Sequence, residues 1–169
     1  MVELIKQNLK ENKKVYKKIE KDLRKNIPLY VPIEHVGSTA IPNMYGKNII
    51  DILIGAKDDI EFDYIHRILI KNKFVSSKRS KTKIYEFFAS TASETTSGDI
   101  HIHLVIVDTD RYKEFIILRD YLLSNKEEAK NYSNFKKNLI KSGITSREDY
   151  RSQKSKYVER LLLRAKKNI

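Results

Sequence analysis

Apolar and polar residues alternate along this chain with two periods, one typical of helices and the other of strands. Over residues 2–25 and 59–72, apolar side chains recur every three or four positions, which predicts two amphipathic helices. The stretch 48–54 is apolar except for Asp51, so it is predicted to be a central strand buried on both faces. Three further stretches rich in β-branched or aromatic residues also predict strands, with the basic turn SSKRSK between the last two: 29–36, 73–77 and 82–90.

Residues 99–107 alternate most regularly and predict one more strand. With a period of two, Asp99, His101 and His103 share one face, while isoleucine and leucine occupy the other. The face that carries the two histidines is therefore expected to be the polar one.

The last third of the chain predicts three helices. The first covers residues 110–123, the second begins at Ser124 and the third begins at Thr145. Ser124 and Thr145 each precede a glutamate by three positions, which is the spacing of a capping box. Gly143 stands where a glycine would end the middle helix.

Together these elements predict one α+β domain with α/β character, in which a mixed β-sheet is flanked by helices and followed by a C-terminal helical segment. A length of 169 residues fits a single domain, because domains average about 150 residues. Within residues 1–169 we expect the N-terminal helix in 1–26, the mixed sheet in 29–107 and the C-terminal helices in 110–167.

The composition excludes several classes of site. The absence of cysteine excludes disulfide bridges, thiol nucleophiles, iron–sulfur clusters and cysteine-bound zinc, so any metal must use oxygen or imidazole ligands. No segment approaches the ~20 apolar residues of a membrane span, and the first residues lack the apolar run of a signal peptide. We therefore expect a cytoplasmic protein with no membrane partner.

The chain carries 34 Lys and Arg against 22 Asp and Glu, a net charge of +12. Residues 1–26, 71–83 and 146–169 contribute +5, +6 and +5, and the rest of the chain sums to −4. Such an excess favours a polyanionic partner such as nucleic acid, a nucleotide or anionic lipid, and Lys-rich solvated surfaces are the alternative. Because the excess lies in the flanking segments, we interpret it as a rim around a site in the middle of the chain.

Residues 34–54, EHVGSTAIPNMYGKNIIDILI, combine a strand, a Gly-Ser turn, a polar loop and a second strand. Gly37 and Ser38 at a strand end allow backbone N–H groups and a hydroxyl to approach a phosphate. Asp51 follows thirteen residues after Ser38 on the next strand, where its carboxylate could hold a divalent cation that bridges phosphates. This segment is the predicted centre of any chemistry.

The order and spacing of several segments resemble the GrpB family of nucleotidyltransferase-fold proteins. These segments are EHVGSTAIP (34–42), Lys47 with IIDI (49–52), HIHLV (101–105), LRDYLLSNKEEAKNYSNFKKNL (118–139) and KSKYVERLL (154–162). The resemblance implies a mixed sheet with flanking helices, a phosphate-binding turn at Gly37 and Ser38, and a metal-site carboxylate at Asp51. It does not supply a substrate.

The chain departs from the wider nucleotidyltransferase pattern, because Leu53 occupies the place of the second acid. His101 and His103 with Asp51 could substitute for the missing carboxylate and bind Zn²⁺ or Mn²⁺, whereas Mg²⁺ prefers oxygen ligands. Hydrogen bonding to substrate, or a purely structural role, is the alternative for both histidines. The position after Lys47, often proline in the family, is Asn48.

Other candidates also carry two interpretations. Ser38 either binds an anion or only starts a turn, and Lys47 either neutralises a triphosphate or is only solvated. Arg119 belongs to the RDYL segment of the resemblance and could clamp two phosphate oxygens; alternatively it points away from the site. The aromatic residues of one strand could stack on bases, or form sheet core: Tyr85, Phe87 and Phe88.

Our leading hypothesis is a protein that binds a nucleoside triphosphate or related phosphate ester and transfers a nucleotidyl group to an acceptor that the sequence does not identify. Asp51 and Ser38 are the expected catalytic residues, and Gly37, Thr39, Lys47 and Arg119 join Ser38 in substrate binding. A divalent metal (Mg²⁺, Mn²⁺ or Zn²⁺) is expected at Asp51 and the histidines. The alternative is a catalytically degenerate fold that binds RNA or a protein, and a third hypothesis is coenzyme A-related binding.

Overall fold

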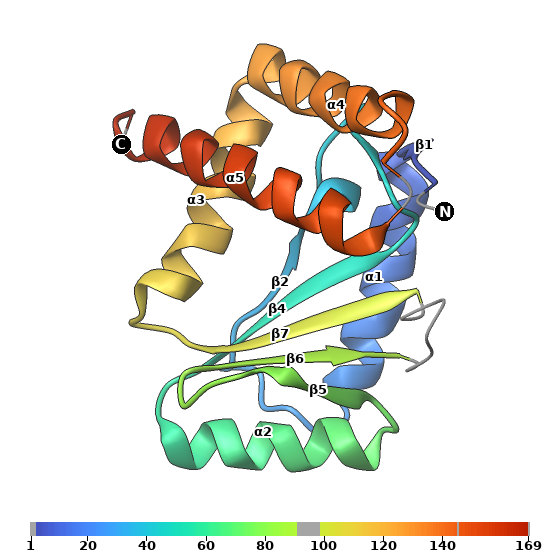
Figure 1. Ribbon diagram of the computed structural model, residues 1–169. Helices are drawn as coiled ribbons and strands as arrows, with labels where there is room; N and C mark the ends of the chain where they lie inside the picture. The colour runs from blue at the N-terminus through green and yellow to red at the C-terminus, as the bar shows by residue number, and fades with distance from the viewer. Residues whose placement is uncertain (1–2, 91–98, 145, 169) are drawn as a thin grey trace.

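The computed structural model describes residues 3–90, 99–144 and 146–168 and contains a mixed five-stranded sheet with helices on both sides (Figure 1). The central strand β4 (Ile50–Ala56) runs parallel to β7 (Ile100–Ile106), and every other neighbouring pair in the sheet is antiparallel. The strand order is β2-β4-β7-β6-β5. The edge strands are β2 (Ile33–Val36) and β5 (Val75–Lys81), and β6 (Tyr85–Ala89) lies between β7 and β5.

Helices α1 (Leu9–Leu23) and α2 (Asp59–Lys71) cover one face of the sheet. The main core lies between them and the apolar faces of β4 and β7, where Ile52, Ile54, Ile102 and Leu104 are fully buried. Burying such side chains contributes about 1.5 to 3 kcal/mol each. The expected central strand and its alternating neighbour are therefore confirmed.

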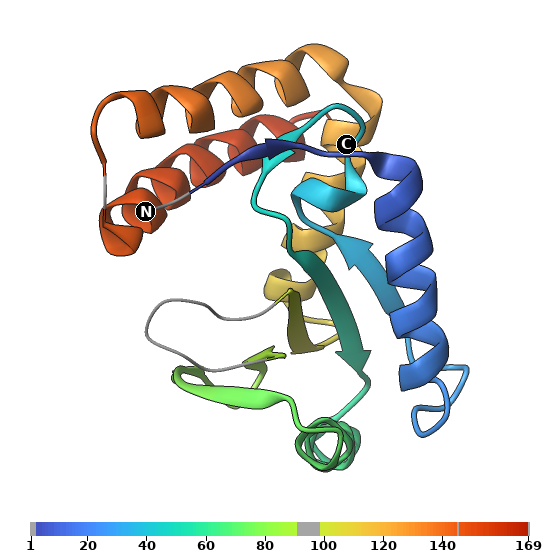
Figure 2. The same ribbon diagram turned by 90° about the vertical axis from the view of Figure 1, so that its right-hand side faces the viewer.

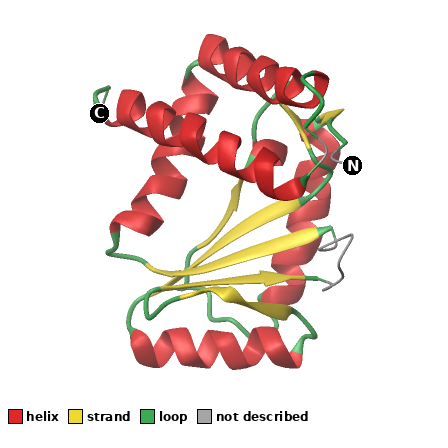
Figure 3. Cartoon of the chain, viewed as in Figure 1, coloured by secondary structure: helices red, strands yellow, loops and turns green. Residues whose placement is uncertain are grey.

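Three C-terminal helices lie on the other side of the sheet: α3 (Asp110–Ser124), α4 (Lys126–Lys141) and α5 (Arg147–Lys166). Helix α3 packs on a small apolar cluster of the sheet that includes Val36, Leu53 and Val105. Helices α4 and α5 lie side by side and pack on the segment that follows β2 (Figure 2). The expected α+β architecture, a mixed sheet with flanking helices and a C-terminal helical segment, is confirmed (Figure 3).

The helix expected over residues 2–25 begins only at Leu9. The side chain of Asn8 caps it by accepting from the backbone N–H groups of Lys10 and Glu11. The preceding residues form β1 (Ile5–Lys6), which pairs with β3 (Tyr45–Gly46). Gln7 donates its side-chain amide to the carbonyl of Gly46 at 3.0 Å, so tertiary pairing overrides the helical period.

Three other boundaries differ from the sequence-based expectation. Strand β2 begins at Ile33 because Leu29, 86% exposed, lies in a turn before Pro32. Strand β5 continues through residues 76–81, which were expected to form a basic turn, because it pairs with β6. The cap of α4 is Asn125, whose side chain accepts from the N–H of Glu128. The hydroxyl of Ser124, the expected cap, instead bonds back to carbonyls of α3.

Helix α5 begins after Ser146, whose hydroxyl accepts from the N–H of Asp149. Thr145, the residue expected to cap this helix, lies outside the described residues. Gly143 follows α4 with a φ of +85°, as expected of a glycine that ends a helix. Among the described residues, no helix is long and apolar enough to cross a membrane.

Candidate functional site

The register of β4 against β7 brings the predicted metal-binding residues together. Asp51 is paired with His101, and Leu53 is paired with His103, so all four side chains share the sheet face opposite α1 and α2. The Oδ1 atom of Asp51 lies 3.3 Å from Nδ1 of His101 and 3.7 Å from Nε2 of His103. The three side chains retain exposed fractions of 26%, 18% and 15%, so all remain accessible.

Gly37 lies directly against the carboxylate of Asp51. Its φ is +73°, a conformation that non-glycine residues rarely adopt, and a Cβ atom there would lie 2.2 Å from Oδ2 of Asp51. The turn that follows β2 therefore requires glycine for two independent reasons. It also places the 3-10 turn η1 (Ser38–Ala40) beside Asp51.

Asp51 is ionised at neutral pH. Burial alone would raise its pKa, but hydrogen bonds and charge interactions with His101 and His103 outweigh burial and hold that pKa well below its usual range. The pKa of His103 is lowered, first by burial, although Asp51 opposes that shift. The site therefore presents one carboxylate beside two imidazole rings, which can donate or accept hydrogen bonds.

The donor set of Asp51, His101 and His103 has the chemistry of a Zn²⁺ or Mn²⁺ site. Among the described residues, however, no group of three or more His, Cys, Asp or Glu side chains is arranged to hold a metal by itself. Position 53 is a leucine, so the strand supplies no second carboxylate there. The Leu53 side chain is instead fully buried beside Val36 and Val105. A metal here needs further ligands, such as phosphate oxygens of a substrate.

Ser38 contacts a buried lysine from the C-terminal helices. The Nζ atom of Lys136, on α4, donates to the Oγ atom of Ser38 at 2.9 Å. Lys136 is 1% exposed, and its Nζ atom also lies 4.5 Å from the ring centroid of Tyr132. A buried ammonium group is costly unless it is paired, and Lys136 has no carboxylate partner among the described residues.

Two lysines near Ser38 have lowered pKa values, first because of burial and second because of neighbouring cations. Burial, followed by the charge of Lys154, lowers the pKa of Lys136 to about 7, although Asp51 raises it. Burial also lowers the pKa of Lys47, and the charges of Lys154, Arg147 and Arg151 lower it further. These side chains belong to α4, the loop before β4 and the first half of α5, and they converge on one region.

Thr39 is fully buried, and its hydroxyl lies 2.9 Å from Nε2 of His35. Burial lowers the pKa of His35 to about 4, so this histidine is neutral at pH 7. Its ring stacks on Tyr16 at 4.7 Å, on the α1 side of the sheet. Only the backbone N–H of Thr39 is therefore a plausible group for anion binding, because its hydroxyl is already engaged.

Arg119 is held by two carboxylates. Its Nη1 atom lies 2.6 Å from Glu34 on β2, and its Nε atom lies 2.7 Å from Asp120. These contacts raise the pKa of Arg119 although burial opposes the shift. Arg119 would have to leave one of these partners to clamp a phosphate, so its predicted role as a clamp requires a rearrangement.

Lys136, the most buried cation of the site, is not among the residues predicted from the sequence. One signal was present: the buried residues of α4 are Ala129, Tyr132, Ser133 and Lys136, at helical positions i, i+3, i+4 and i+7. A lysine on the apolar stripe of a helix is unusual, because lysine is almost never fully buried without a partner. Its spatial partner, Ser38, lies 98 positions away and no local pattern connects the two.

Sequence analysis also left open the roles of the aromatic residues of β6. Phe88 is fully buried in the main core. Tyr85 lies on the opposite face, and its hydroxyl lies 2.9 Å from Nδ1 of His103. Phe87 also faces the site, with its ring centroid 4.8 Å from that of His101. The strand therefore divides these residues between core and site.

Two surface hollows of about 410 and 470 Å³ border α1 and the residues next to it. Neither includes Ser38, Asp51 or the two histidines of β7. The candidate site is therefore identified by the chemistry of its side chains, not by the depth of a hollow.

Comparison with known proteins identifies one family and several relatives that match most of the chain. The family described as GrpB protein matches residues 3–164. The Glutamate-rich protein GrpB of Alkalihalophilus pseudofirmus is 30% identical over 132 residues, which cover 77% of this chain and 76% of the relative. A UPF0157 protein of Deinococcus radiodurans is 26% identical over 132 residues, which cover 78% of this chain and 66% of the relative.

The crystal structure of the conserved protein GrpB from Enterococcus faecalis superimposes with a TM-score of 0.82 at 18% identity and covers 98% of each chain, which shows a shared fold. The Cid1 poly(U) polymerase aligns at 14% identity with a TM-score of 0.46, over 69% of this chain and 38% of that one. This second similarity is too weak to support a shared activity. Because the family match spans nearly the full sequence, the membership expected from the sequence motifs is confirmed, and the chain belongs to the GrpB family.

Proposed function

We propose that this protein binds the phosphate groups of a nucleoside triphosphate, or of a related phosphate ester, at the Gly37–Ser38 turn. The observation that carries the proposal is the buried ammonium group of Lys136, which reaches Ser38 without any carboxylate partner among the described residues. A buried charge without a partner lowers the stability of the folded protein, and such groups are common at functional sites. A phosphate would supply the missing negative charge.

The neighbouring cations support an anionic ligand. Lys47, Arg147, Arg151 and Lys154 form no ion pair with any carboxylate in the part of the chain that the structure describes. Burial and then the charges of Lys154, Arg147 and Arg151 lower the pKa of Lys47, so a polyanion bound among these cations would relieve their repulsion as well as add attraction. Three of these residues, Arg147, Arg151 and Lys154, belong to the basic segment 146–169, which supports its interpretation as a rim of the site.

Asp51 gives the site a charge of opposite sign. An ionised carboxylate beside a phosphate is unfavourable unless a cation lies between them. A divalent metal would be held by Asp51 with His101 and His103, would complete its coordination with phosphate oxygens, and would supply Lewis-acid chemistry when bound. The residues of the site fit such a shared metal better than a metal bound by the protein alone.

In the catalytic form of this proposal, the bound triphosphate donates its nucleotidyl group to an acceptor. A bond forms between an acceptor hydroxyl oxygen and the α-phosphorus, the bond to the bridging oxygen breaks, pyrophosphate leaves, and the hydroxyl proton passes to solvent water. Lys136 and Lys47 offset the charge that pyrophosphate gains, and Ser38 donates to its oxygens. Ser38, which contacts the phosphate, and Asp51, which would hold the metal, are the residues whose loss is expected to affect transfer most.

Thermal unfolding with each of the four nucleoside triphosphates, in the presence of Mg²⁺, Mn²⁺ or Zn²⁺, tests the proposal. A ligand that binds the folded chain raises the unfolding temperature, and that increase is expected to disappear in Ser38→Ala and Asp51→Ala. Transfer of an α-phosphate label to an acceptor then separates binding from catalysis. The absence of any increase with all four triphosphates would contradict the proposal.

Full burial of Leu53 at the place of a second acid favours one alternative, a non-catalytic fold that binds RNA. In that case affinity for RNA would fall steeply with salt, because binding would release counterions from the phosphate backbone. Asp51→Ala would leave RNA affinity unchanged. Filter binding of a single-stranded RNA at 50 and 200 mM salt distinguishes this alternative from nucleotide binding.

A further inference from the structure

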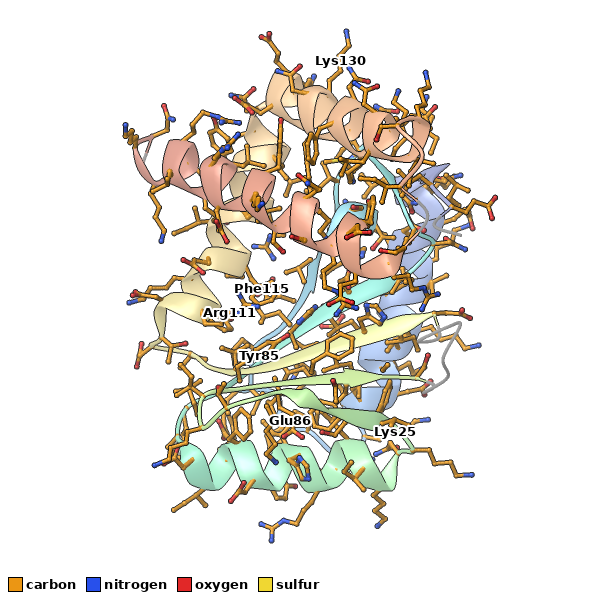
Figure 4. The ribbon with its side chains drawn as sticks, in the orientation of Figure 1. Lys25, Tyr85, Glu86, Arg111, Phe115 and Lys130 are labelled. Atoms are coloured by element: carbon orange, nitrogen blue, oxygen red, sulfur yellow. The ribbon has the colours of Figure 1, made fainter. Side chains whose placement is uncertain are left out.

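An arginine and two aromatic rings, Arg111, Tyr85 and Phe115, lie together between the start of α3 and the sheet (Figure 4). The guanidinium carbon of Arg111, at the start of α3, lies 4.8 Å from the ring centroid of Tyr85 and 5.1 Å from that of Phe115. Arg111 is exposed, and it forms no ion pair with a carboxylate of the described residues. Two rings therefore support the planar guanidinium from the protein side.

These rings are connected to the rest of the site. The ring of Phe115 lies 4.6 Å from that of His103, and the hydroxyl of Tyr85 bonds the same histidine. His103 in turn faces Asp51, and Asp51 lies against Gly37. The site is thus a continuous row that begins at the Ser38–Lys136 pair and ends at Arg111.

We propose that the surface formed by Arg111, Tyr85 and Phe115 stacks against the base of a nucleotide whose phosphates lie at the Gly37–Ser38 turn. The proposal rests on the proposed function, and it adds the position of the base. Arginine stacks on aromatic planes on both of its faces, and base stacking is sequence-tolerant because every base has a π-face. A nucleotide has the matching polarity, with anionic phosphates at one end and a planar ring at the other.

The test compares ligands with and without a base. The full chain is titrated calorimetrically with each nucleoside triphosphate and with inorganic tripolyphosphate, both in buffer that contains Mn²⁺. In Arg111→Ala, nucleoside triphosphate affinity is expected to fall about tenfold, which is the loss of one stacking contact. Affinity for tripolyphosphate is expected to change less than about twofold, because a charge at the distant end of the site is screened.

A second variant separates stacking from charge. Arg111→Trp keeps a planar surface but removes the cation, and it introduces the sole tryptophan of the chain. This variant is expected to retain nucleotide affinity within about threefold of the original, and its fluorescence is expected to be quenched by nucleotide but not by tripolyphosphate. Arg67→Ala, on the exposed surface of α2, is the matched control and leaves both affinities unchanged.

The outcomes distinguish the two proposals. If Arg111→Ala weakens nucleotide and tripolyphosphate equally, Arg111 acts by charge alone and the base-stacking inference is wrong while phosphate binding stands. If the unmodified chain binds both ligands equally well, the base makes no contact and the inference is again wrong. If the chain binds neither ligand, the proposed function fails and the inference fails with it.

Discussion

The Nζ atom of Lys136 lies 2.9 Å from the Oγ atom of Ser38 and joins α4 to the turn that follows β2. The contact links two parts of the chain that are 98 positions apart, across the boundary between the sheet and the C-terminal helices. It is the point at which the cations of the C-terminal helices meet the Gly-Ser turn. The predictions below depend on this contact and on the carboxylate beside it.

Replacing Lys136 with methionine is expected to stabilise the fold and abolish anion binding. Methionine fills a similar volume without the cost of a buried charge, so the free energy of unfolding at pH 7 should rise by about 2 kcal/mol or more. Urea denaturation measures the stability, and titration with tripolyphosphate measures binding. Loss of stability in Lys136→Met would show that the ammonium group serves the fold instead of a ligand.

The stabilisation by Lys136→Met is expected to depend on pH in a defined direction. The pKa of Lys136 falls from its usual 10.5 to about 7 on folding, so the unfolded chain binds more protons between these pH values. The free-energy cost of burying the charged Lys136 is therefore complete below pH 7. It decreases by about 1.4 kcal/mol per pH unit between pH 7 and pH 10.5 and is absent at higher pH. Denaturation of the unmodified chain and of Lys136→Met at pH 6, 8 and 10 should show that their difference in free energy of unfolding becomes smaller as pH rises. A difference that stays constant would contradict the lowered pKa of Lys136.

Asp51→Asn is expected to change anion binding in opposite directions with and without metal. Without metal and with chelator present, loss of the negative charge should raise tripolyphosphate affinity about fivefold, equivalent to about 1 kcal/mol. With Mn²⁺, the gain in affinity that the metal gives the unmodified chain should disappear. Asp63→Asn, on the exposed surface of α2, is the control and should change neither measurement.

Gly37→Ala is expected to destabilise the protein more than Gly143→Ala. Both glycines have positive φ, which costs alanine about 1 to 2 kcal/mol, but only at Gly37 would the new Cβ atom meet the carboxylate of Asp51. At Gly143 nothing lies within 4 Å of that position. The difference between the two losses, measured by denaturation, isolates the steric contact, and equal losses would mean that the Asp51 side chain moves away freely.

The proximity of Asp51, His101 and His103 follows from rules that act over short distances. The period-two alternation of β7 places both histidines on one face of the sheet. The adjacent strand β4 carries one carboxylate, Asp51, and its pairing with β7 brings that carboxylate beside the histidines. The residues from the C-terminal helices could not be placed in this way. Lys136 and Arg111 reach the site only because α3, α4 and α5 fold back over the sheet, and that path depends on packing between distant segments.

Errors at the ends of elements have a related cause. Ile5 and Lys6 fit a helical period, yet they pair with Tyr45 and Gly46, which are distant in sequence. Residues 76–81 contain the basic segment expected to be a turn, yet β5 continues and pairs with β6, with a register shift between Ser76 and Lys81. Local sequence propensity therefore predicts whether most segments form helix or strand, whereas pairing between distant strands determines where several of these segments begin and end.

The pairing of β1 with β3 fixes the N-terminal segment against the loop that carries Lys47. The backbone N–H of Gln7 donates to the carbonyl of Met44 at 2.8 Å, and its side-chain amide bonds the carbonyl of Gly46. Gly46 in turn lies so close to Ser38 that a Cβ atom there would meet its hydroxyl at 2.8 Å. A change at Gln7 would therefore weaken ligand affinity from a distance, and such a loss should not be mistaken for a direct contact with the ligand.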